Sequence, residues 1–467
     1  MRVTVHLRNL DPALRERITA HIHDNWSKAT VTSETNPNPA QGNEAALLIL
    51  GDGSATVETA APLKETIIVP SSFSAQQILF LVDAKLGKLT NSDIVNVKRS
   101  APRKAVVSRR EFLLGSFAKP PPLQNLPVVA SDSCEAKFGC SKCVDACPAP
   151  GALRIENSSV IVSSEHCVEC GICAGVCPVA AIQTPSFSED AYVGLLKALH
   201  DSSAPKKTLV ITCNKSSVPR QAWMDVEEVR GIGSVGVRQL AMAADSSISA
   251  LLVYCPDGLC VGKENAKRAA NLISSIKGEH GPTVAYLEGS AGILQMDQNH
   301  KSAQVHDGTL TPAGTPWREY VKSLKSISTT EAQVKGLGLT EMKVADSCTL
   351  CYACVETCPH KGALAIQEDT LIFTPEECTG CGYCEQTCPE RSITLTEMAG
   401  SIKLSARTVY KDEMIRCAKC NTPYVSAKMF KKVSATLQSH ETTLKLCQSC
   451  KQKEAYEKIL GSLRGPT

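Results

Sequence analysis

Long hydrophobic runs are absent from this chain of 467 residues. No stretch of about 18 consecutive apolar residues occurs, which argues against a transmembrane helix. Aromatic residues make up only 4% of the chain, so a surface that stacks nucleic-acid bases is not expected. The formal net charge of +3 is too small to indicate a polyanionic partner. The length allows three or more soluble domains of about 100–200 residues each.

The abundant residue is cysteine, which occurs 23 times. The cysteines fall into two dense blocks (134–177 and 348–388), a spaced quartet (417–450) and three single residues, Cys213, Cys255 and Cys260. Disulfide frameworks are typical of small secreted domains, whereas a chain of this length can bury a core without them. Clustered cysteine spacing in a large chain predicts metal binding.

Each dense block contains two copies of a four-cysteine motif followed by proline. Three copies have the spacing C-x2-C-x2-C-x3-C-P, and the first copy has C-x5-C-x2-C-x3-C-P. Nineteen residues separate the two motifs in each block, and these segments match as GALRIENSSVIVSSEHC and GALAIQEDTLIFTPEEC. The two blocks are therefore an internal repeat. The sixteen cysteines are Cys134, Cys140, Cys143, Cys147, Cys167, Cys170, Cys173, Cys177, Cys348, Cys351, Cys354, Cys358, Cys378, Cys381, Cys384 and Cys388.

This motif is typical of bacterial ferredoxins that bind two [4Fe–4S] clusters, in which the fourth cysteine of one motif ligates the other cluster. Zinc is disfavoured because zinc sites use pairs of C-x2-C rather than a triplet plus one. We therefore expect four [4Fe–4S] clusters. The expected ligand sets are Cys134, Cys140, Cys143 and Cys177; Cys167, Cys170, Cys173 and Cys147; Cys348, Cys351, Cys354 and Cys388; and Cys378, Cys381, Cys384 and Cys358. The longer first loop, between Cys134 and Cys140, is expected to be mobile and to admit solvent.

The last quartet has the spacing of a zinc ribbon. Two C-x2-C pairs stand 26 residues apart, which suits one Zn²⁺ bound by four thiolates, Cys417, Cys420, Cys447 and Cys450. An iron-only rubredoxin site is the alternative, although the proline and glycine usual beside its cysteine pairs are missing. Between the pairs lie Lys428, Lys431 and Lys432. They suit either a nucleic-acid surface or a solvated helix face, and we favour the helix face.

The first hundred residues predict a small α/β domain of unknown role. Val3–Leu7 alternates like a strand, and Asp11 with Pro12 predicts the start of a helix. Ala45–Leu50 and Thr66–Val69 predict buried parallel strands. A second helix, from Ser72 to near Gly87, carries an apolar stripe. The stripe consists of Ile78, Leu81, Val82 and Leu86.

Residues 188–290 predict a second α/β domain with a mostly parallel sheet. The expected strands are Leu209–Thr212, Val226–Val229, Leu251–Tyr254 and Thr283–Leu287, with helices near 190–200, 235–244 and 263–276. Gly231, Gly233 and Gly236 match G-x-G-x-x-G after a strand, a pattern found in dinucleotide sites. No acidic residue follows on the next strand, between Ser249 and Tyr254, so nucleotide binding is the minor alternative. The three single cysteines follow predicted strands and are either a site or buried and inert.

Two segments connect these parts. Residues 291–345 are polar and rich in glycine and proline, which predicts a linker. The stretch SRREFLL at 108–114 is similar to a twin-arginine export signal, but the apolar run after it is short and about a hundred residues precede it. We expect an ordered or chaperone-contacting arm and a cytoplasmic protein.

The motifs from about residue 105 to 455 resemble the multidomain 4Fe–4S ferredoxin-type proteins associated with formate dehydrogenases and related molybdenum or tungsten enzymes. The stretch VEEVRGIGSVGVRQLAMAADSSISALLVYCPDGLC is similar to the iron–sulfur delta-subunit domain of methyl-viologen-reducing hydrogenases and heterodisulfide reductases. RCAKCNTPYVSAKMFKKV with LCQSC looks like the C-terminal ribbon of the multidomain ferredoxin-type proteins. The delta-subunit domain binds a [2Fe–2S] cluster, but here only Cys213, Cys255 and Cys260 remain, so we expect them not to be cluster ligands.

The sequence therefore predicts an α+β multidomain protein. Its parts are an α/β domain (1–100), a first dicluster ferredoxin module (131–185), a delta-subunit-like α/β domain (188–290), a linker (291–345), a second dicluster module (346–396) and a zinc ribbon (410–455).

The expected function is electron relay to or from a dehydrogenase, reductase or hydrogenase subunit, such as a formate dehydrogenase, with no catalytic residue, no nucleic acid and no membrane span. Peripheral membrane association is left open. The alternatives are an oxidoreductase whose middle domain binds a flavin or nicotinamide, or works a thiol pair, and a regulatory iron–sulfur protein that binds a partner through its ribbon.

Overall fold

The computed structural model describes most of the chain in two compact units. The described residues are 3–8, 10–32, 45–51, 63–69, 72–91, 125–213, 218, 221–277, 281–289, 293, 315–328, 335–437 and 444–463. The first unit consists of Met1–Cys134 with Lys142–Thr329, and the second of Glu135–Ser141 with Thr330–Thr467. Among the described residues, no helix has the length and apolar character needed to cross a bilayer.

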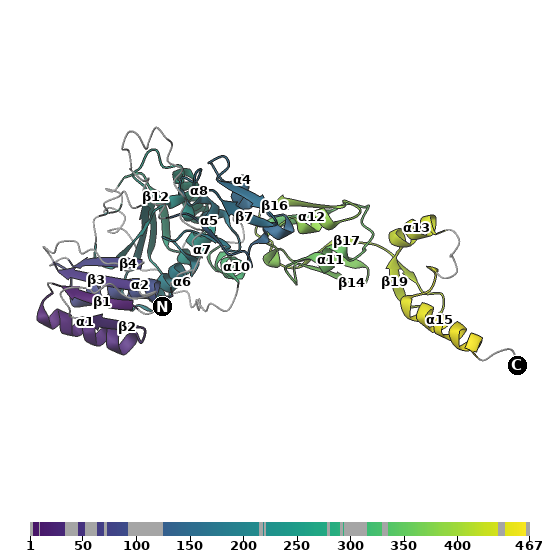
Figure 1. Cartoon of the computed structure of the whole chain (residues 1–467), viewed down its shortest axis with the longest axis horizontal. Helices are drawn as coiled ribbons and strands as arrows, with labels where there is room; N and C mark the ends of the chain where they lie inside the picture. Colours follow the sequence, from purple (N-terminus) through teal and green to yellow (C-terminus); the bar gives the residue numbers. More distant parts are fainter. Residues whose placement is uncertain are drawn as a thin grey trace, which may run out of the picture. The chain divides into compact units, whose positions relative to one another are not determined.

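The N-terminal domain contains a four-stranded parallel sheet with the order β2-β1-β3-β4 (Figure 1). Its elements are β1 (Val3–Arg8), α1 (Pro12–Asn25), β2 (Ala29–Thr32), β3 (Ala45–Gly51), β4 (Leu63–Val69) and α2 (Ala75–Asn91). The Asp11 carboxylate accepts hydrogen bonds from the backbone nitrogens of Ala13 (3.0 Å) and Leu14 (3.1 Å), and so caps α1. Ile18 and Ile22 are buried. The sequence-predicted helix start and parallel strands are confirmed.

Helix α2 is longer than predicted. It continues past Gly87 to Asn91, and its stripe of Ile78, Leu81, Val82 and Leu86 is buried as expected. Gly87 lies inside the helix, where a Cβ atom would stand 2.5 Å from the carbonyl oxygen of Gly194. That glycine belongs to α6 (Glu189–Asp201). Gly87 therefore permits close packing of α2 against α6. From the sequence alone, the same glycine predicts the end of the helix.

Buried charges join α2 to the middle domain. The Lys85 ammonium, 2% exposed, lies 3.2 Å from Asp225 Oδ1 and 3.4 Å from Glu227 Oε2, and it donates to the carbonyl of Val226 at 2.9 Å. Lys88 pairs with both Glu227 and Glu65. The acidic partners Asp225 and Glu227 lie on β10 (Met224–Val229) and are almost fully buried.

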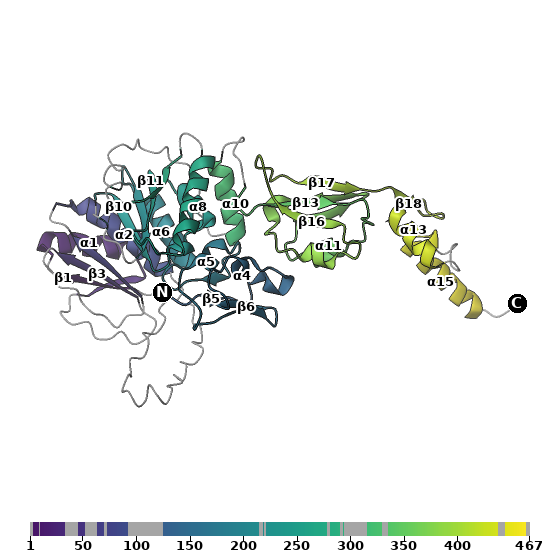
Figure 2. The ribbon, with the colours of Figure 1, turned by 90° about the horizontal axis from the view of Figure 1, so that it is seen from above.

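The middle domain has a second parallel sheet, ordered β10-β9-β11-β12. Figure 2 labels two of its strands, β10 and β11. Its further elements are β9 (Thr208–Cys213), η2 (Ile232–Ser234), α7 (Val237–Ala244), β11 (Ala250–Tyr254), α8 (Lys263–Ile276) and β12 (Thr283–Leu287). Each predicted strand and helix of this domain is present. Leu209, Val210 and Leu251 are fully buried, as expected for a covered parallel sheet.

The segment 291–345, expected to be a linker, contains regular structure among its described residues. Helix α10 (Pro316–Ile327) is capped by Thr315 and buries Trp317, Tyr320 and Leu324. It packs against α7 of the middle domain. The linker prediction missed this helix because the surrounding residues are polar. The apolar side chains of the helix do repeat at helical spacing. The SRREFLL stretch lies outside the described residues.

The two cysteine-rich modules share one order of elements: strand, short helix, hairpin, short helix, strand. The first has β5 (Val128–Val129), η1 (Glu135–Phe138), α4 (Lys142–Asp145), β6 (Leu153–Glu156), β7 (Ser159–Val162), α5 (Ile172–Val176) and β8 (Ile182–Gln183). The second has β13 (Thr340–Val344), α11 (Ala353–Thr357), β14 (Leu364–Gln367), β15 (Thr370–Phe373), η3 (Pro375–Glu377), α12 (Tyr383–Thr387) and β16 (Ile393–Glu397). In both modules the outer strands pair antiparallel, β5 with β8 and β13 with β16.

The C-terminal part begins with β17 (Arg407–Lys411), which extends the β14–β15 hairpin. The antiparallel pair β18 (Met414–Arg416) and β19 (Pro423–Ser426) follows, with α13 (Ala427–Thr436) and α15 (Gln448–Leu463). The Ser426 hydroxyl, at the end of β19, donates to the carbonyl of Thr349 at 2.7 Å, which ties the β18–β19 pair to the first cysteine loop of the second module.

Candidate iron–sulfur and metal centres

The second module gathers four cysteine side chains around one cavity. The cavity is lined by Cys348, Cys351, Cys354 and Cys388 together with Leu350, Tyr352, Ile366, Leu371 and Ile393 among others. Three of these cysteines come from one motif and the fourth from the other. Four thiols around a space with apolar side chains suit a [4Fe–4S] cluster, which is ligated by thiolates and shielded from water.

The other four cysteines of this module form the reciprocal group. Burial raises the pKa of Cys381 to about 11, and Cys358 and Cys140 are among the neighbouring thiols that add to the shift. Burial also raises the pKa of Cys384, with further contributions from Cys378, Cys381, Cys354 and Cys358. Cys358, the fourth cysteine of the first motif, is therefore close to Cys381 and Cys384 of the second motif. These groupings match the expected ligand sets, and the assignment of the ligands stays a prediction.

The backbone on both sides of the second cysteine is left-handed in three of the four motifs. In three motifs the residues before and after it have positive φ: Glu169 (54°) and Gly171 (79°), Leu350 (50°) and Tyr352 (66°), Gly380 (70°) and Gly382 (84°). Left-handed conformations are costly for residues with a Cβ and often mark functional sites. One result is that backbone N–H groups reach the thiols, as Glu169 N does at 3.5 Å from Cys167 Sγ.

Hydrogen bonds to sulfur differ between the cysteines. Burial tends to raise the pKa of Cys388, but the hydroxyl and backbone N–H of Ser392, at 3.3 and 3.4 Å from its Sγ, outweigh burial and lower it. Burial raises the pKa of Cys354 to about 12, the charges of neighbouring thiols adding to the effect. Such hydrogen bonds and burial set the electron density on a ligating sulfur.

The first module repeats the reciprocal arrangement. Burial is the largest cause of the raised pKa of both Cys167 and Cys170, and the Cys147 thiol adds to both shifts. Cys147 is the fourth cysteine of the other motif. Cys143 likewise lies near Cys173 and contributes to its raised pKa, after burial and the Cys170 thiol.

The longer first loop is not an open loop. Its residues form the 3-10 helix η1, and they belong to the same compact unit as the second module. Glu135 is 5% exposed and pairs with His360, and it accepts a hydrogen bond from the hydroxyl of Thr379 at 2.9 Å. The rings of Phe138 and Tyr383 stand 5.3 Å apart. The expected admission of solvent therefore does not hold at Glu135 and Ala136, which are buried, whereas Lys137 and Gly139 are exposed, and the expected mobility stays a prediction.

The glycine motif of the middle domain faces the first module. Gly233 N donates to the carbonyl of Cys170 at 3.1 Å. A Cβ on Gly231 would lie 2.4 Å from the carbonyl oxygen of Glu169, and one on Gly236 would lie 2.0 Å from that of Gly175. The glycines thus allow the cysteine loop to approach, in the place where a dinucleotide motif would leave room for phosphates. This packing disfavours the nucleotide-binding alternative.

Substituting Gly233 with alanine tests this interpretation. The new Cβ would stand 2.6 Å from both Cys170 O and Ile172 Cγ1, so we expect a stability loss of about 1–3 kcal/mol from overpacking. Hydrogen exchange should show weaker protection of α5. Gly258→Ala is the matched control, since nothing lies within 4 Å of a Cβ there. Unchanged protection of α5 in Gly233→Ala would show that the loop does not depend on this glycine.

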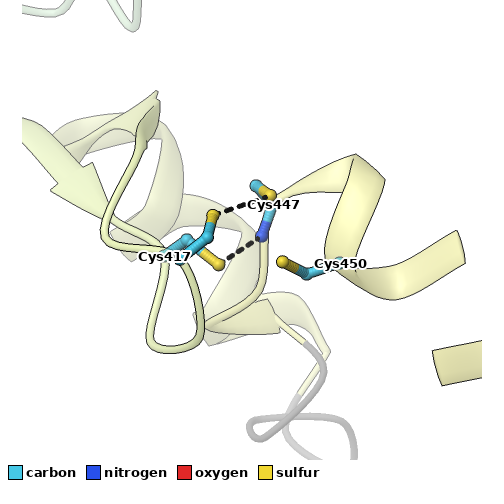
Figure 3. Close-up of side chains that lie close together, drawn as sticks. Cys417, Cys447 and Cys450 are labelled. Carbon is cyan, nitrogen blue, oxygen red and sulfur yellow. Dashed lines mark hydrogen bonds between the residues drawn. The ribbon is translucent and has the colours of Figure 1, made fainter. Parts of the chain in front are cut away.

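The C-terminal quartet is already assembled as a four-thiol site. The sulfur atoms of Cys417, Cys420, Cys447 and Cys450 all lie within 4.8 Å of one another, and Figure 3 shows the labelled thiols facing a common centre. The Cys447 backbone N–H donates to Cys417 Sγ at 3.3 Å, and this hydrogen bond is the main cause that lowers the pKa of Cys417 to about 6. The arrangement fits a tetrahedral metal site with four cysteine ligands.

Two of the three lysines between these pairs make contacts inside the chain. Lys432 Nζ lies 2.6 Å from a carboxylate oxygen of Glu390, and Lys428 donates to the carbonyl of Asp346 at 2.6 Å. Lys431 is exposed. Lys432 is also exposed despite its ion pair, so both lysines lie on the solvent-facing side of α13. The choice between a solvated helix face and a nucleic-acid surface stays a prediction.

Comparison with known proteins supports 4Fe–4S binding in parts of the two cysteine-rich modules. Residues 341–389 match the family described as "4Fe-4S dicluster domain", and residues 160–183 match the family described as "4Fe-4S binding domain". The chain contains two 4Fe–4S ferredoxin-type domains.

A further match is short. Over 46 residues the chain is 42% identical to a subunit of the ion-translocating oxidoreductase complex of Methanosarcina acetivorans. The match covers 10% of this chain and 17% of that relative. It therefore extends to a small part of either protein, and the architecture around the ferredoxin-type domains is described only by the structure.

Proposed function

We propose that the protein carries four [4Fe–4S] clusters and one Zn²⁺, and relays electrons to or from a partner oxidoreductase. The observation that carries this proposal is the reciprocal grouping of thiols, in which Cys388, Cys358 and Cys147 each lie with the triplet of the other motif. When bound, a [4Fe–4S] cluster supplies one-electron redox chemistry. The chain's residues would hold it through thiolates, shield it with apolar side chains and adjust it with hydrogen bonds to sulfur.

Contacts within each compact unit support a connected relay. In the first unit Cys143 lies near Cys173, and in the second Cys354 lies near Cys384, so one thiol of each expected set adjoins the other set. Within the second unit Cys140 also lies near Cys381.

The partner we propose is a subunit of a dehydrogenase, reductase or hydrogenase, with a formate dehydrogenase-like enzyme as the leading candidate, in the cytoplasm. The short similarity to a subunit of an ion-translocating oxidoreductase complex supports a partner of the oxidoreductase class. An enzyme with a flavin or nicotinamide in the middle domain is less supported, because the cysteine loop packs on its glycine motif.

An anaerobic reductive titration tests the relay. We expect the iron–sulfur absorbance to bleach with about four electrons residing on clusters, one on each. Spin counting of the reduced protein measures this number. A flavin absorption band, or a nucleotide released on denaturation, would contradict the relay and favour the enzyme.

A further inference from the structure

Two buried thiols face each other at the carboxyl ends of β9 and β11, the two central strands of the middle sheet. Cys213 is the last residue of β9, and Cys255 directly follows β11. These strands are neighbours, with Thr212 opposite Tyr254, so the two cysteines are adjacent in register. Their sulfur atoms are 3.5 Å apart, and the residues are 4% and 1% exposed. Carboxyl ends of parallel strands are where α/β domains place functional groups.

The backbone spacing suits a reversible bond between these sulfurs. Neighbouring strands lie about 4.7–4.9 Å apart, which falls inside the usual Cα separation of about 4.4–6.8 Å for a disulfide. Burial is the main cause that raises the pKa of Cys255 to about 12, and the hydrogen bond with Cys213 adds to it. In the reduced state Cys255 therefore holds a proton rather than a charge at neutral pH.

A third cysteine connects this pair to the surface. The Cys260 thiol is close enough to contribute to the raised pKa of Cys255, and it is partly exposed. Its loop is ordered by Asp257, whose carbonyl accepts from Cys260 N at 3.2 Å and whose carboxylate accepts from Leu259 N at 3.0 Å. Leu259 is 92% exposed. The loop thus separates two buried thiols from one accessible thiol.

The same loop leads directly to the first ferredoxin-type domain. A Cβ on Gly262 would stand 2.6 Å from Gly233 N and 3.0 Å from the carbonyl oxygen of Cys170. Gly233 N is itself hydrogen-bonded to that carbonyl at 3.1 Å. One residue separates Cys260 from Gly262, so the loop that carries this thiol packs directly against the backbone of an expected cluster ligand, Cys170.

We propose that Cys213 and Cys255 form a dithiol–disulfide couple that exchanges two electrons with low-potential one-electron carriers. On reduction the Sγ–Sγ bond breaks, and each sulfur gains one electron and one proton from solvent. On oxidation the bond forms again, and two electrons and two protons leave. The identity of the carrier rests on the proposed function, since the carrier is the cluster expected at Cys147, Cys167, Cys170 and Cys173, and the Cys170 backbone packs against the loop at Gly262. Two successive one-electron transfers thus reduce one disulfide, and the reduced pair of thiols holds two electrons.

Electron counting on the full-length protein tests this proposal. The protein is purified anaerobically, oxidised with thionine, desalted and reduced coulometrically through a viologen mediator, while spin counting gives the electrons held on clusters. We expect total uptake in the wild type to exceed the cluster electrons by about two. Cys213→Ser and Cys255→Ser should each lose this excess and keep their iron. Cys260→Ser is the matched control and should retain the excess.

Failure of the proposed disulfide couple can be distinguished from failure of the electron relay. A cross-linked peptide containing Cys213 and Cys255 in a non-reducing digest of oxidised protein would support the couple, and its disappearance after viologen reduction would show reversibility. Equal total and cluster counts in the wild type, with no cross-linked peptide, would overturn the couple. A loss of about two iron in Cys213→Ser or Cys255→Ser would also overturn it, in favour of metal ligation. Failure of the relay itself would appear instead as low iron or absent bleaching in every sample.

Discussion

Replacing Lys85 with methionine is expected to lower the free energy of opening between α2 and β10 by about 3–5 kcal/mol. The substitution removes an ammonium that is 2% exposed and leaves Asp225 and Glu227 without it. Lys88 remains as the partner of Glu227 and Glu65. The loss is large because an unpaired charge is then buried, while the apolar volume of the side chain is kept.

Hydrogen exchange measures this local opening without unfolding the whole chain. Amides of β10 should exchange about a hundredfold or more faster in Lys85→Met. Lys28→Met, at an exposed position of the same domain, is the control and should change little. Because burial raises the pKa of Glu227, a proton is more readily taken up there at about pH 5, and the loss should be smaller than at about pH 8. Equal exchange rates of the β10 amides in Lys85→Met and Lys28→Met would refute a stabilising role for the ion pairs of Lys85.

Replacing Cys388 with alanine is expected to disrupt the cluster held by the opposite motif. Cys388 lines the cavity with Cys348, Cys351 and Cys354, so its loss should leave that expected cluster with three thiolates and make it labile. We expect a loss of one to about four iron per chain. Alkylation of the native protein, mapped by mass spectrometry, should increase at Cys348, Cys351 and Cys354.

The equivalent substitution in the first motif of this module is the control. Cys358→Ala should expose Cys378, Cys381 and Cys384 to alkylation and spare the first triplet. If each substitution instead exposes the triplet of its own motif, the reciprocal ligand sets are wrong. If neither changes alkylation or iron, the fourth cysteines are not ligands.

The elements that the sequence predicted correctly are those determined by local patterns. Asp11 and Pro12 mark a helix start through contacts two and three residues away. The strands of the middle sheet are runs of buried apolar residues, such as Leu209–Thr212. The cysteine triplets are close in sequence, so their spacing already indicates a shared centre.

Features that depend on distant partners could not be predicted in this way. Lys85 and Asp225 are 140 residues apart, and each alone resembles an ordinary solvated charge. Gly233 matches a dinucleotide pattern, yet its neighbour is the carbonyl of Cys170 in another domain. The extra residues after Cys134 suggest a loose loop until Glu135 is seen to pair with His360. In each case the physical cause is a tertiary contact that leaves no periodic signal.

Metal analysis of the anaerobically purified protein tests the central claim most directly. Four [4Fe–4S] clusters and one four-thiolate zinc site predict about sixteen iron, about sixteen acid-labile sulfide and about one zinc per chain. About eight iron with several zinc would contradict the claim, because at least one cysteine-rich module would then hold zinc in place of clusters.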